Sequence, residues 1–435
     1  MSLKDLSKAR IFVIAGEPSG DNLGAKLIEA LQSDAIAQYM QASFGKRLKF
    51  DFYGIGGLRM KKAGCEIIFD YTNIALMGFI EVIPNILKIM ERLRQCVDAI
   101  VSYRPHAIIT IDSNAFNFRV VERVRQDPSF ANGVLPKMIH WVAPSVWAFR
   151  SKKRAYKVGK LYDHIMLLLP FEKQYFRHMP STFVGHPIVE SKKPDNSWCV
   201  QARSKYGIAG SDMLVTIMPG SRKQEIKKHM PVLVEFIQEL GMQYKALNKN
   251  IKFFIPISEQ LRSSVEASFD PYKDKAWYDN VIVSVSRTYK STMITASDLA
   301  IVKCGTSILE VMKLDVPIIA FYKLSLISAY ILKLRLTIKY VTLCNLLLGS
   351  PVISELLQEN FTVKNLIRDA VKFLEDKALG KQCVNQYQKV WKMLGDNEEI
   401  TPSMRAARAV IDTLLSPPNS ICDSPMNLLT KKGKY

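Results

Sequence analysis

The sequence offers little for metal binding or disulfide cross-linking. Its seven cysteines are scattered, no two stand at C-x-x-C spacing, and no D-x-D motif or cluster of histidine and cysteine is present. An odd, scattered set of thiols is typical of a reduced, cytosolic protein. We therefore expect neither a metal site nor a disulfide framework.

Long apolar stretches are also missing. The most apolar region, 316–348, is interrupted by four basic side chains, and no run of 18 uncharged apolar residues occurs. A helix that spans a bilayer needs about 20 such residues, so none is expected. The apolar run that starts at Ile11 is too short for a signal peptide. These features predict a cytoplasmic chain and are compatible with one that lies on a membrane surface.

Acidic residues are the scarcer charge. Lys and Arg number 60 and Asp and Glu 40, which gives a formal charge of +20. This excess favours an anionic partner: nucleic acid, an acidic membrane or phosphorylated substrates. Apolar residues make up 48%, which excludes a disordered or fibrous chain. The length of 435 residues predicts two or three domains.

Short apolar runs alternate with helical patterns along the chain. Runs rich in β-branched residues predict buried parallel strands. They lie at 11–15, 107–111 and 138–142 in the first half, and at 214–218, 251–257, 281–285, 299–302 and 316–321 in the second. Such alternation predicts parallel sheets with right-handed crossovers, and two series predict an α/β protein of two Rossmann-like domains.

A polar segment with two prolines, 185–198, marks the seam between the two series. We expect a first domain over 1–187 and a second over 188–380. The helices of 381–415 are expected to pack back on the first domain. The polar segment 416–435 is expected to be a disordered tail.

Ligands of open parallel sheets bind at the carboxyl ends of the strands, and two loops of the first half qualify. In Gly16–Asp21, glycines permit close approach and a helix N-terminus attracts anions. The alternative is a turn capped by Ser19 or Asp21. Asp112 follows the strand 107–111, where a carboxylate can act as general base. The alternative is an ordinary turn aspartate.

A third loop, Pro219–Arg222, follows the first strand of the second half. It puts Arg222 in the first turn of a helix, where a cation opposes the helix dipole. A bound diphosphate would account for this position through a bidentate contact. The alternative is a solvated arginine beside a capping box formed by Ser221 and Gln224.

The fourth loop is Lys303–Glu310. Backbone N–H groups of the turn at Gly305 and Thr306 would meet a phosphate, and Glu310 would accept hydrogen bonds from ribose hydroxyls. The alternative for Glu310 is a capping box with Ser307.

Two further segments suggest surfaces. The segment 150–160 holds six basic residues in eleven and is either a solvated face or a contact for an anionic surface. The segment 72–93 is unusually apolar. It is either a buried helix pair broken by Pro84 or a patch that meets acyl chains.

Several motifs resemble the lipid-A-disaccharide synthase family, from about Ile11 to Leu357. They are AGEPSGDNLGA (15–25), GIGGLRMKKAGCE (54–66), MGFIEV (77–82), HWVAPSVWAFR (140–150), LPFEK (169–173), VGHPI (184–188), MPGSRKQEI (218–226), GTSILE (305–310), YVTLCNLLLG (340–349) and SELLQE (354–359). The resemblance implies GT-B architecture, with two facing Rossmann-like domains and a cleft between them. It also implies that the first domain, 1–187, lies on the acceptor and membrane side and that the second, 188–380, binds the UDP-sugar.

The same resemblance implies an inverting, metal-independent hexosyltransferase of lipid A (lipopolysaccharide) biosynthesis. The enzyme would join UDP-2,3-diacylglucosamine to 2,3-diacylglucosamine 1-phosphate, giving the β-1,6-linked disaccharide 1-phosphate and UDP. It would need no cofactor, since the UDP-sugar is its donor substrate. It would be cytoplasmic and peripheral on the anionic inner membrane, with no nucleic-acid partner, and an oligomer is compatible with it.

Carried over by motif, the resemblance also implies site roles. Asp112 is the candidate catalytic base for the 6-hydroxyl of the acceptor. Arg222 would hold the diphosphate of UDP. The turns at Gly220 and Ser221 and at Gly305 and Thr306 would bind it as well, and Glu310, Asn345, Gln358 and Glu359 would surround the nucleoside and donor sugar. Glu17, Ser19, Gly20 and Asp21 would face the acceptor.

The chain departs from the family pattern at three positions. Where the family reads D-x-P-D-F-N, this chain has Ala115 in place of the second aspartate, so Asn114 or Asn117 would have to orient Asp112. Cys304 replaces a serine and Cys344 a proline.

Three other functions are compatible with parts of the sequence. A different UDP-sugar enzyme of this fold, such as an epimerase or a lipid-linked GlcNAc transferase, is the nearest, although the apolar segment 77–90 favours acylated substrates. An inactive lipid-binding relative is suggested by Ala115. A nucleic-acid-binding protein is suggested only by charge, without a supporting motif.

Overall fold

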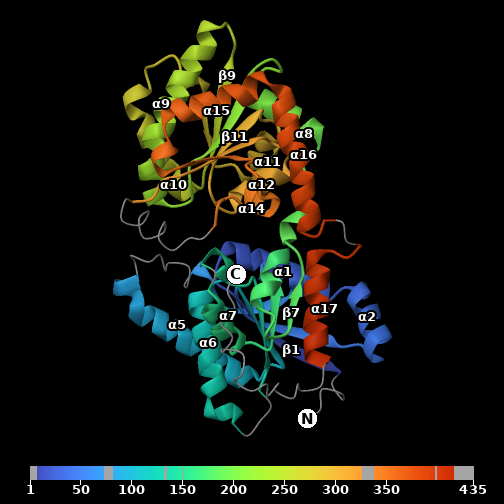
Figure 1. The fold of residues 1–435 in the computed structure, drawn as a ribbon. Coiled ribbons are helices and arrows are strands. Elements are labelled where there is room, and N and C mark those ends of the chain that lie inside the picture. Colours follow the sequence, from blue (N-terminus) through green and yellow to red (C-terminus); the bar gives the residue numbers. More distant parts are fainter. Residues whose placement is uncertain are drawn as a thin grey trace, which may run out of the picture. The chain divides into compact units, whose positions relative to one another are not determined.

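Two parallel sheets covered by helices make up the protein. The computed structural model describes residues 7–72, 82–131, 135–149, 151–325, 338–396 and 399–415. The chain divides into two units (Figure 1). The first contains residues 1–144, 153–184 and 403–435, and the second contains 145–152 and 185–402.

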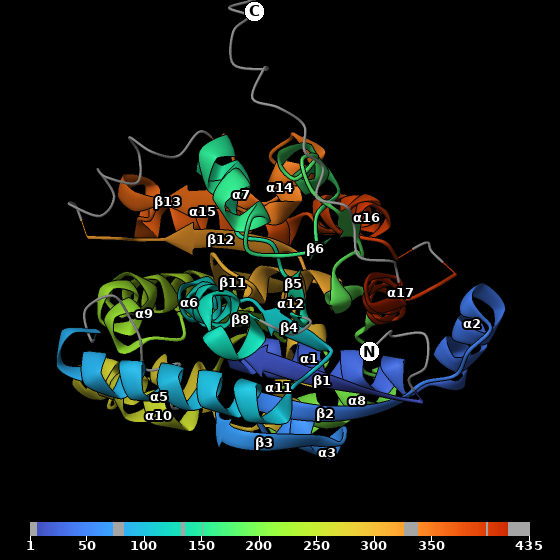
Figure 2. The same cartoon turned by 90° about the horizontal axis from the view of Figure 1, so that it is seen from below.

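The first unit holds a seven-stranded sheet in the order β3-β2-β1-β4-β5-β6-β7, parallel throughout. Figure 2 shows β1, β2 and β3 side by side. The strands are β1 (Lys8–Ala15), β2 (Lys49–Gly56), β3 (Cys65–Asp70), β4 (Ala107–Ile111), β5 (Lys137–Trp141), β6 (His164–Leu167) and β7 (Ser181–Phe183). The helices are α1 (Pro18–Leu31), α2 (Asp34–Phe44), α3 (Leu58–Lys62), α5 (Val82–Tyr103), α6 (Asn114–Gln126), α7 (Lys152–Gly159) and α17 (Pro402–Leu415).

The second unit holds a six-stranded parallel sheet in the order β10-β9-β8-β11-β12-β13. Its strands are β8 (Met213–Met218), β9 (Ile251–Pro256), β10 (Val281–Ser284), β11 (Leu299–Lys303), β12 (Ile318–Tyr322) and β13 (Ser354–Leu357). Its helices are α8 (Asn196–Lys205), α9 (Lys223–Ala246), α10 (Glu259–Glu266), α11 (Arg287–Thr295), α12 (Ser307–Lys313), α14 (Leu343–Leu348), α15 (Val363–Glu375) and α16 (Lys377–Met393).

Each sheet has one point where the strand order reverses. In the first sheet β1 lies between β2 and β4, and in the second β8 lies between β9 and β11. Crossovers leave in opposite directions from such a switch point, so the loops after the two central strands flank an open crevice. These are the loops after β1 and β4, and those after β8 and β11. The four loops selected from the sequence are the loops at the two switch points.

The expected α/β fold with two parallel sheets is confirmed. All eight predicted strands are present, with ends within three residues of the prediction. The strands that the sequence analysis missed are β2, β3, β6, β7 and β13. Three of them, β3, β7 and β13, lie at sheet edges, where fewer side chains are buried and the apolar pattern is weak.

The core of the first unit is built from both ends of the chain. Buried residues of β1, such as Ile11 and Val13, belong to the same apolar cluster as Ala406, Val410 and Leu414 of α17. Of the 381–415 segment, only α17 belongs to the first unit, because α16 lies in the second. The tail from 416 lies outside the described residues.

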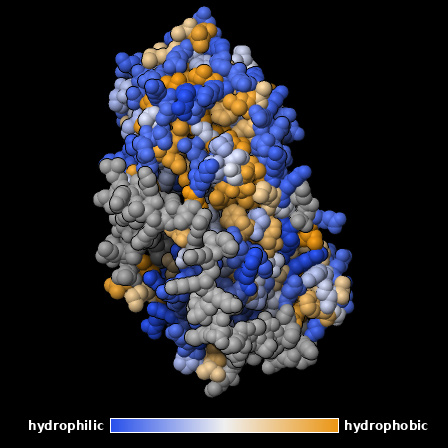
Figure 3. All heavy atoms as spheres, viewed as in Figure 1, coloured by the Kyte–Doolittle hydropathy of each residue, from blue (hydrophilic) through white to orange (hydrophobic). Residues whose placement is uncertain are grey.

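The cysteines, the helix lengths and the exposed apolar side chains of the described residues can be compared with the sequence analysis. The cysteines described, six of the seven, are buried and free. Within the described ranges no helix is long and apolar enough to cross a membrane. The helix α5 runs through Pro84 in its first turn, and it exposes Leu87 and Met90 at 79% and 50%. Figure 3 shows apolar spheres at that side of the first unit. The rest of the apolar segment before α5, 73–81, lies outside the described residues.

Candidate active site

The tip of β4 carries an unusual backbone. Asp112 and Ser113 have φ of 49° and 43°, and Val142, which follows the neighbouring strand β5, has φ of 75°. Side chains disfavour this left-handed region, and the strain is about 1–3 kcal/mol for each residue. Strain of this kind gathers at functional sites, so this edge of the first sheet is a site candidate on its geometry alone.

The main chain of Asp112 is held at both of its polar groups. Its N–H donates to the carbonyl of Trp141 over 3.0 Å, and its carbonyl accepts from Nδ2 of Asn117 over 2.7 Å. Burial raises the pKa of the Asp112 carboxyl, and the N–H of Ser113 offsets only part of that effect. A raised pKa makes this carboxylate a stronger base than an exposed aspartate.

A buried histidine supports the start of α6. His140 is fully buried, and its Nδ1 lies 2.7 Å from the hydroxyl of Thr110, which lies 3.0 Å from the hydroxyl of Tyr162. Nε2 lies 3.1 Å from Oδ1 of Asn114. Because an amide oxygen only accepts, Nε2 carries the proton of the neutral ring. Burial lowers the pKa of His140 to about 3, so the ring is neutral.

The loop after β1 is shaped by one buried carboxylate. Oδ1 of Asp21 accepts from the N–H groups of Gly57 and Met60, at 2.7 and 3.1 Å, and Oδ2 accepts from that of Arg59 at 3.1 Å. Asp21 therefore caps α3, and the N-cap of α1 is Glu17, which makes no side-chain capping bond. The alternative that Ser19 or Asp21 caps α1 is wrong.

Two further candidates in this loop, Gly20 and Ser19, differ in exposure. Gly20 is buried, and a Cβ there would lie 3.3 Å from Cβ of Ala15, so its size lets α1 approach the sheet. Ser19 is exposed to solvent. Of the polar candidates Ser19 and Asp21, only Ser19 presents a side chain that is not already committed to the fold.

At the second switch point, the loop after β8 is held by its own helix. Arg222 is the N-cap of α9 and is exposed, with no side-chain capping bond. Oε2 of Glu225 accepts from the N–H of Ser221 over 2.9 Å. Gly220 has φ of 141°, and a Cβ there would lie 2.7 Å from that oxygen. The expected capping box of Ser221 and Gln224 is wrong, because the helix begins later and Glu225 makes the contact.

Two buried groups tie this loop to the neighbouring strands. Oε1 of Glu225 pairs with Nζ of Lys303, at the end of β11, over 2.8 Å. Burial would raise the pKa of Glu225, but Lys303 and the N–H of Ser221 outweigh it, so the pKa is lowered and the carboxylate is charged. Nδ1 of His229 donates to the carbonyl of Pro219 over 2.7 Å, and burial lowers the pKa of its ring.

The turn after β11 differs from its expected capping. Thr306 is the N-cap of α12 without a side-chain bond, and Glu310 pairs with Nζ of Lys290 over 2.9 Å. The capping box of Ser307 and Glu310 is therefore wrong. Gly305 and Thr306 are exposed, so this turn meets solvent next to the half-buried ammonium of Lys303.

The three candidates near β13 have different surroundings. Asn345 is fully buried: its Nδ2 donates to the carbonyl of Ile353 over 2.7 Å, and its Oδ1 accepts from that residue's N–H over 2.8 Å. Its amide is thus committed to the fold. Gln358 has φ of 51° and accepts from the N–H of Leu324 over 3.2 Å, and Glu359 is exposed.

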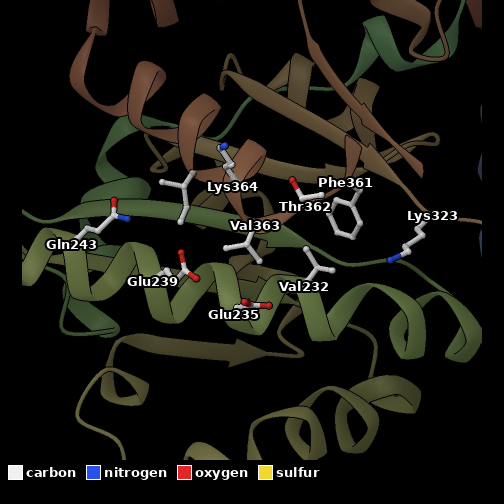
Figure 4. Close-up of a pocket in the computed structure, with 10 residues that line it drawn as sticks. Val232, Glu235, Glu239, Gln243, Lys323, Phe361, Thr362, Val363 and Lys364 are labelled. Atoms are coloured by element: carbon white, nitrogen blue, oxygen red, sulfur yellow. The ribbon is translucent and has the colours of Figure 1, made fainter. Parts of the chain in front are cut away.

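A groove of about 620 Å³ runs between α9 and the start of α15. Figure 4 shows Glu235 and Glu239 on its α9 side, with Lys364 on α15 and Lys323 at one end. Two carboxylates on one wall disfavour a diphosphate. We therefore do not assign the groove to the nucleotide. Within the described ranges, no group of three or more His, Cys, Asp or Glu could hold a metal ion.

Comparison with known proteins identifies the family. A family model described as lipid-A-disaccharide synthetase matches residues 11–409. The lipid-A-disaccharide synthases of Rhodospirillum centenum and Rickettsia felis are 33% and 34% identical, over 93% and 94% of this chain and 94% and 97% of theirs. The chain belongs to the lipid-A-disaccharide synthase family. It is thus a hexosyltransferase of lipid A disaccharide synthesis, with a UDP-sugar and an acceptor as substrates.

Solved structures support the fold. A putative UDP-N-acetylglucosamine 2-epimerase from Listeria monocytogenes superposes with a TM-score of 0.61 at 11% identity, over 94% of this chain and 96% of that one. This likeness shows that the synthase family shares its GT-B fold with such enzymes.

Sequence reasoning missed the residues that support the loops of this family member. Glu225 lies inside the MPGSRKQEI motif, three residues after Arg222, and that spacing was the available signal. His140, His229 and Lys303 gave no such signal, because their partners are distant in sequence and meet them only through strand order.

The buried neutral ring of His140 predicts sensitivity to acid. Its pKa is about 3 in the folded state and 6.5 unfolded, so the unfolded state binds the proton first as pH falls. Stability of the first unit should fall by about 1.4 kcal/mol for each pH unit below 6.5. Between pH 7 and pH 5, the free energy of unfolding measured with denaturant should fall by about 2 kcal/mol less in His140→Gln than in the unmodified protein. Equal losses would contradict a depressed pKa.

Proposed function

We propose that this chain joins UDP-2,3-diacylglucosamine to 2,3-diacylglucosamine 1-phosphate, releasing UDP and the β-1,6-linked disaccharide 1-phosphate. The observation that carries the proposal is that each sheet of this family member has a switch point with candidate loops beside it. One switch point bears a half-buried carboxylate with a raised pKa, Asp112. The other bears the exposed turn of Gly305 and Thr306 and the exposed Arg222.

UDP would bind at the second switch point. Arg222 is suited to bidentate contact with the diphosphate, and the turn of Gly305 and Thr306 would donate backbone N–H groups. Gly220 and Ser221 would line the site, with the N–H of Ser221 held by Glu225. The charged pair of Glu225 and Lys303 holds these two turns together. Charge that develops on departing UDP is stabilised by these fixed dipoles and by the guanidinium.

The remaining contacts to the donor would come from Glu310, Gln358 and Glu359, for the nucleoside and the sugar. Asn345 has a different role in this proposal. Its buried amide fixes the turn before β13 and so places Gln358 and Glu359.

Transfer would be an inverting displacement without a metal or cofactor. The 6-hydroxyl of the acceptor attacks the anomeric carbon of the donor, on the face opposite UDP. The new C–O bond forms as the bond to the diphosphate oxygen breaks, and Asp112 accepts the hydroxyl proton. Burial that raises the pKa of Asp112 supports this role. Glu17 and Ser19 would face the acceptor, while Gly20 and Asp21 shape their loop.

The purified protein should convert both acylated substrates to the disaccharide 1-phosphate, detected by mass spectrometry, and do so in excess chelator. A donor without acyl chains should react far more slowly. Release of N-acetylmannosamine or its UDP derivative from UDP-GlcNAc would instead identify an epimerase. UDP binding with no disaccharide under any condition would identify an inactive relative.

The matched control for this assay is Asp112→Ala. As a missing general base, it should lower turnover by about 10²-fold or more. Affinity for UDP should be unchanged, because Asp112 lies on the other sheet from the nucleotide loops. Near-normal turnover would remove Asp112 from the mechanism.

Arg222→Ala should weaken UDP binding by about 1.5–3 kcal/mol, the size of a hydrogen bond to a charged group. Isothermal titration calorimetry with UDP measures this directly. Lys228→Ala is the control, since it removes an exposed positive charge farther along α9. Equal weakening in both variants would indicate a general charge effect, and unchanged affinity in Arg222→Ala would reject the contact.

We further propose that the protein docks on an anionic inner-membrane surface through α7. This helix exposes Lys153, Lys157 and the ring of Tyr156, at 54%, and Lys160 lies 4.9 Å from the centre of that ring. Among the described residues no carboxylate pairs with these lysines. An exposed aromatic ring among unpaired cations suits the interface between headgroups and acyl chains.

The triple variant Lys153→Gln, Lys157→Gln and Lys160→Gln should bind vesicles of anionic phospholipid about 100-fold more weakly, at roughly 1 kcal/mol per charge. Co-sedimentation measures the partition. The same replacement at Lys377, Lys381 and Lys389 on α16 changes the net charge equally and should have little effect. Equal losses from both sets would contradict docking through α7.

A further inference from the structure

We propose that Asn117 is a positioning residue that holds Asp112 in its working orientation. The proposal rests on the proposed function, in which Asp112 is the base. The side chain of Asn117 is fully buried in the first turns of α6. Its Nδ2 donates to the carbonyl of Asp112 over 2.7 Å and to that of Ile111 over 3.3 Å. One amide thus binds two consecutive carbonyls, that of Ile111 at the end of β4 and that of Asp112 just after it.

The direction of this amide is fixed by chemistry. A flipped amide would place its oxygen against two carbonyl oxygens, which have no proton to share. In the observed direction Oδ1 of Asn117 is buried without a hydrogen-bond partner among the described residues. A buried polar atom left without a partner is unfavourable. We infer that position 117 requires the N–H donors of the amide, and that the unpartnered Oδ1 is the cost of supplying them.

Asn117 does not serve the helix that carries it. The N-cap of α6 is Ser113, which makes no side-chain capping bond, and the amide of Asn117 points back to β4 instead. The opposite side of the tip is held by the bond from the N–H of Asp112 to Trp141. Between these two bonds the backbone of Asp112 stays in its left-handed conformation. Because only two rotatable bonds, Cα–Cβ and Cβ–Cγ, separate the carboxylate oxygens from that backbone, the backbone direction limits where the base points.

The second contact near the tip is separate from this one. His140 fixes the amide of Asn114 over 3.1 Å and has no bond to Asp112. A chain with Ala115, which has no carboxylate beside the base, therefore positions Asp112 through its main chain.

The test replaces Asn117 with leucine, which has a similar size and no donors. Turnover should fall by about 10–100-fold, the effect of a displaced reacting group. KM values and UDP affinity should stay within about threefold, because the substrate contacts are intact. In an Asp112→Ala background the same replacement should have no further effect on turnover, since the group it positions is gone.

Val124→Ala is the matched control. Val124 is buried on the same helix, so its truncation lowers stability without touching β4's tip. Turnover of this variant should stay within about twofold of the unmodified protein when both melting temperatures lie well above the assay temperature. An equal fall in turnover for both variants would show that Asn117 is only structural and would overturn the proposal.

Other outcomes separate this proposal from the function on which it rests. If Asp112→Ala is inactive while Asn117→Leu turns over normally, the positioning role fails and the function stands. If Asn117→Leu loses activity by the same factor in the Asp112→Ala background, it does not act through the base, and the proposal fails. If the unmodified protein makes no disaccharide, the function fails. A crystal structure of Asn117→Leu then tests whether Asn117 positions Asp112. A backbone of Asp112 outside the left-handed region would support this role, and an unchanged backbone would reject it.

Discussion

The reversal of strand order in each sheet is the constraint on which the site depends. A parallel strand delivers its following loop to one edge, and the reversal puts two such loops beside an opening that no crossover helix covers. In the first sheet this gathers the loop after β1 and the tip of β4, and in the second the turns after β8 and β11. Residues about 90 positions apart in sequence, such as Asp21 and Asp112, thereby reach the same edge.

The loops gain their shapes from buried polar groups that reach back from neighbouring elements. Asp21 holds α3, Glu225 holds Ser221 and pairs with Lys303, and His229 holds Pro219. Each group satisfies backbone atoms that a turn would otherwise leave unpaired. The exposed groups, Arg222 among them, are consequently free to meet a ligand without having to hold the loop as well.

The sequence predicted the parts that depend on local pattern. Buried central strands are continuous apolar runs, so the loops that follow them, including Asp112 and Arg222, could be located. Edge strands such as β3 escaped because half-exposed strands lose that pattern. The two capping boxes predicted from spacing alone were wrong. The N–H of Ser221 donates to Glu225 instead of Gln224. Glu310, the expected partner of Ser307, pairs with Lys290.

The site roles show a different limit. Asn345 matches a family motif, yet its amide binds the main chain of Ile353. No spacing rule in the sequence reveals this contact. The supports of the site, His140 and Lys303, are likewise defined by strand neighbours and could be found only once the order of the strands was known.

The shared core of β1 and α17 has a consequence for synthesis of the chain. The second unit is nearly continuous in sequence, whereas the first begins at the N-terminus and is completed by a helix about 400 residues later. During translation, β1 and its neighbours emerge well before their last packing partner, so part of their apolar face must wait uncovered while the other unit is made. Folding of the first unit is thus completed only when α17 packs into the apolar cluster that it shares with β1.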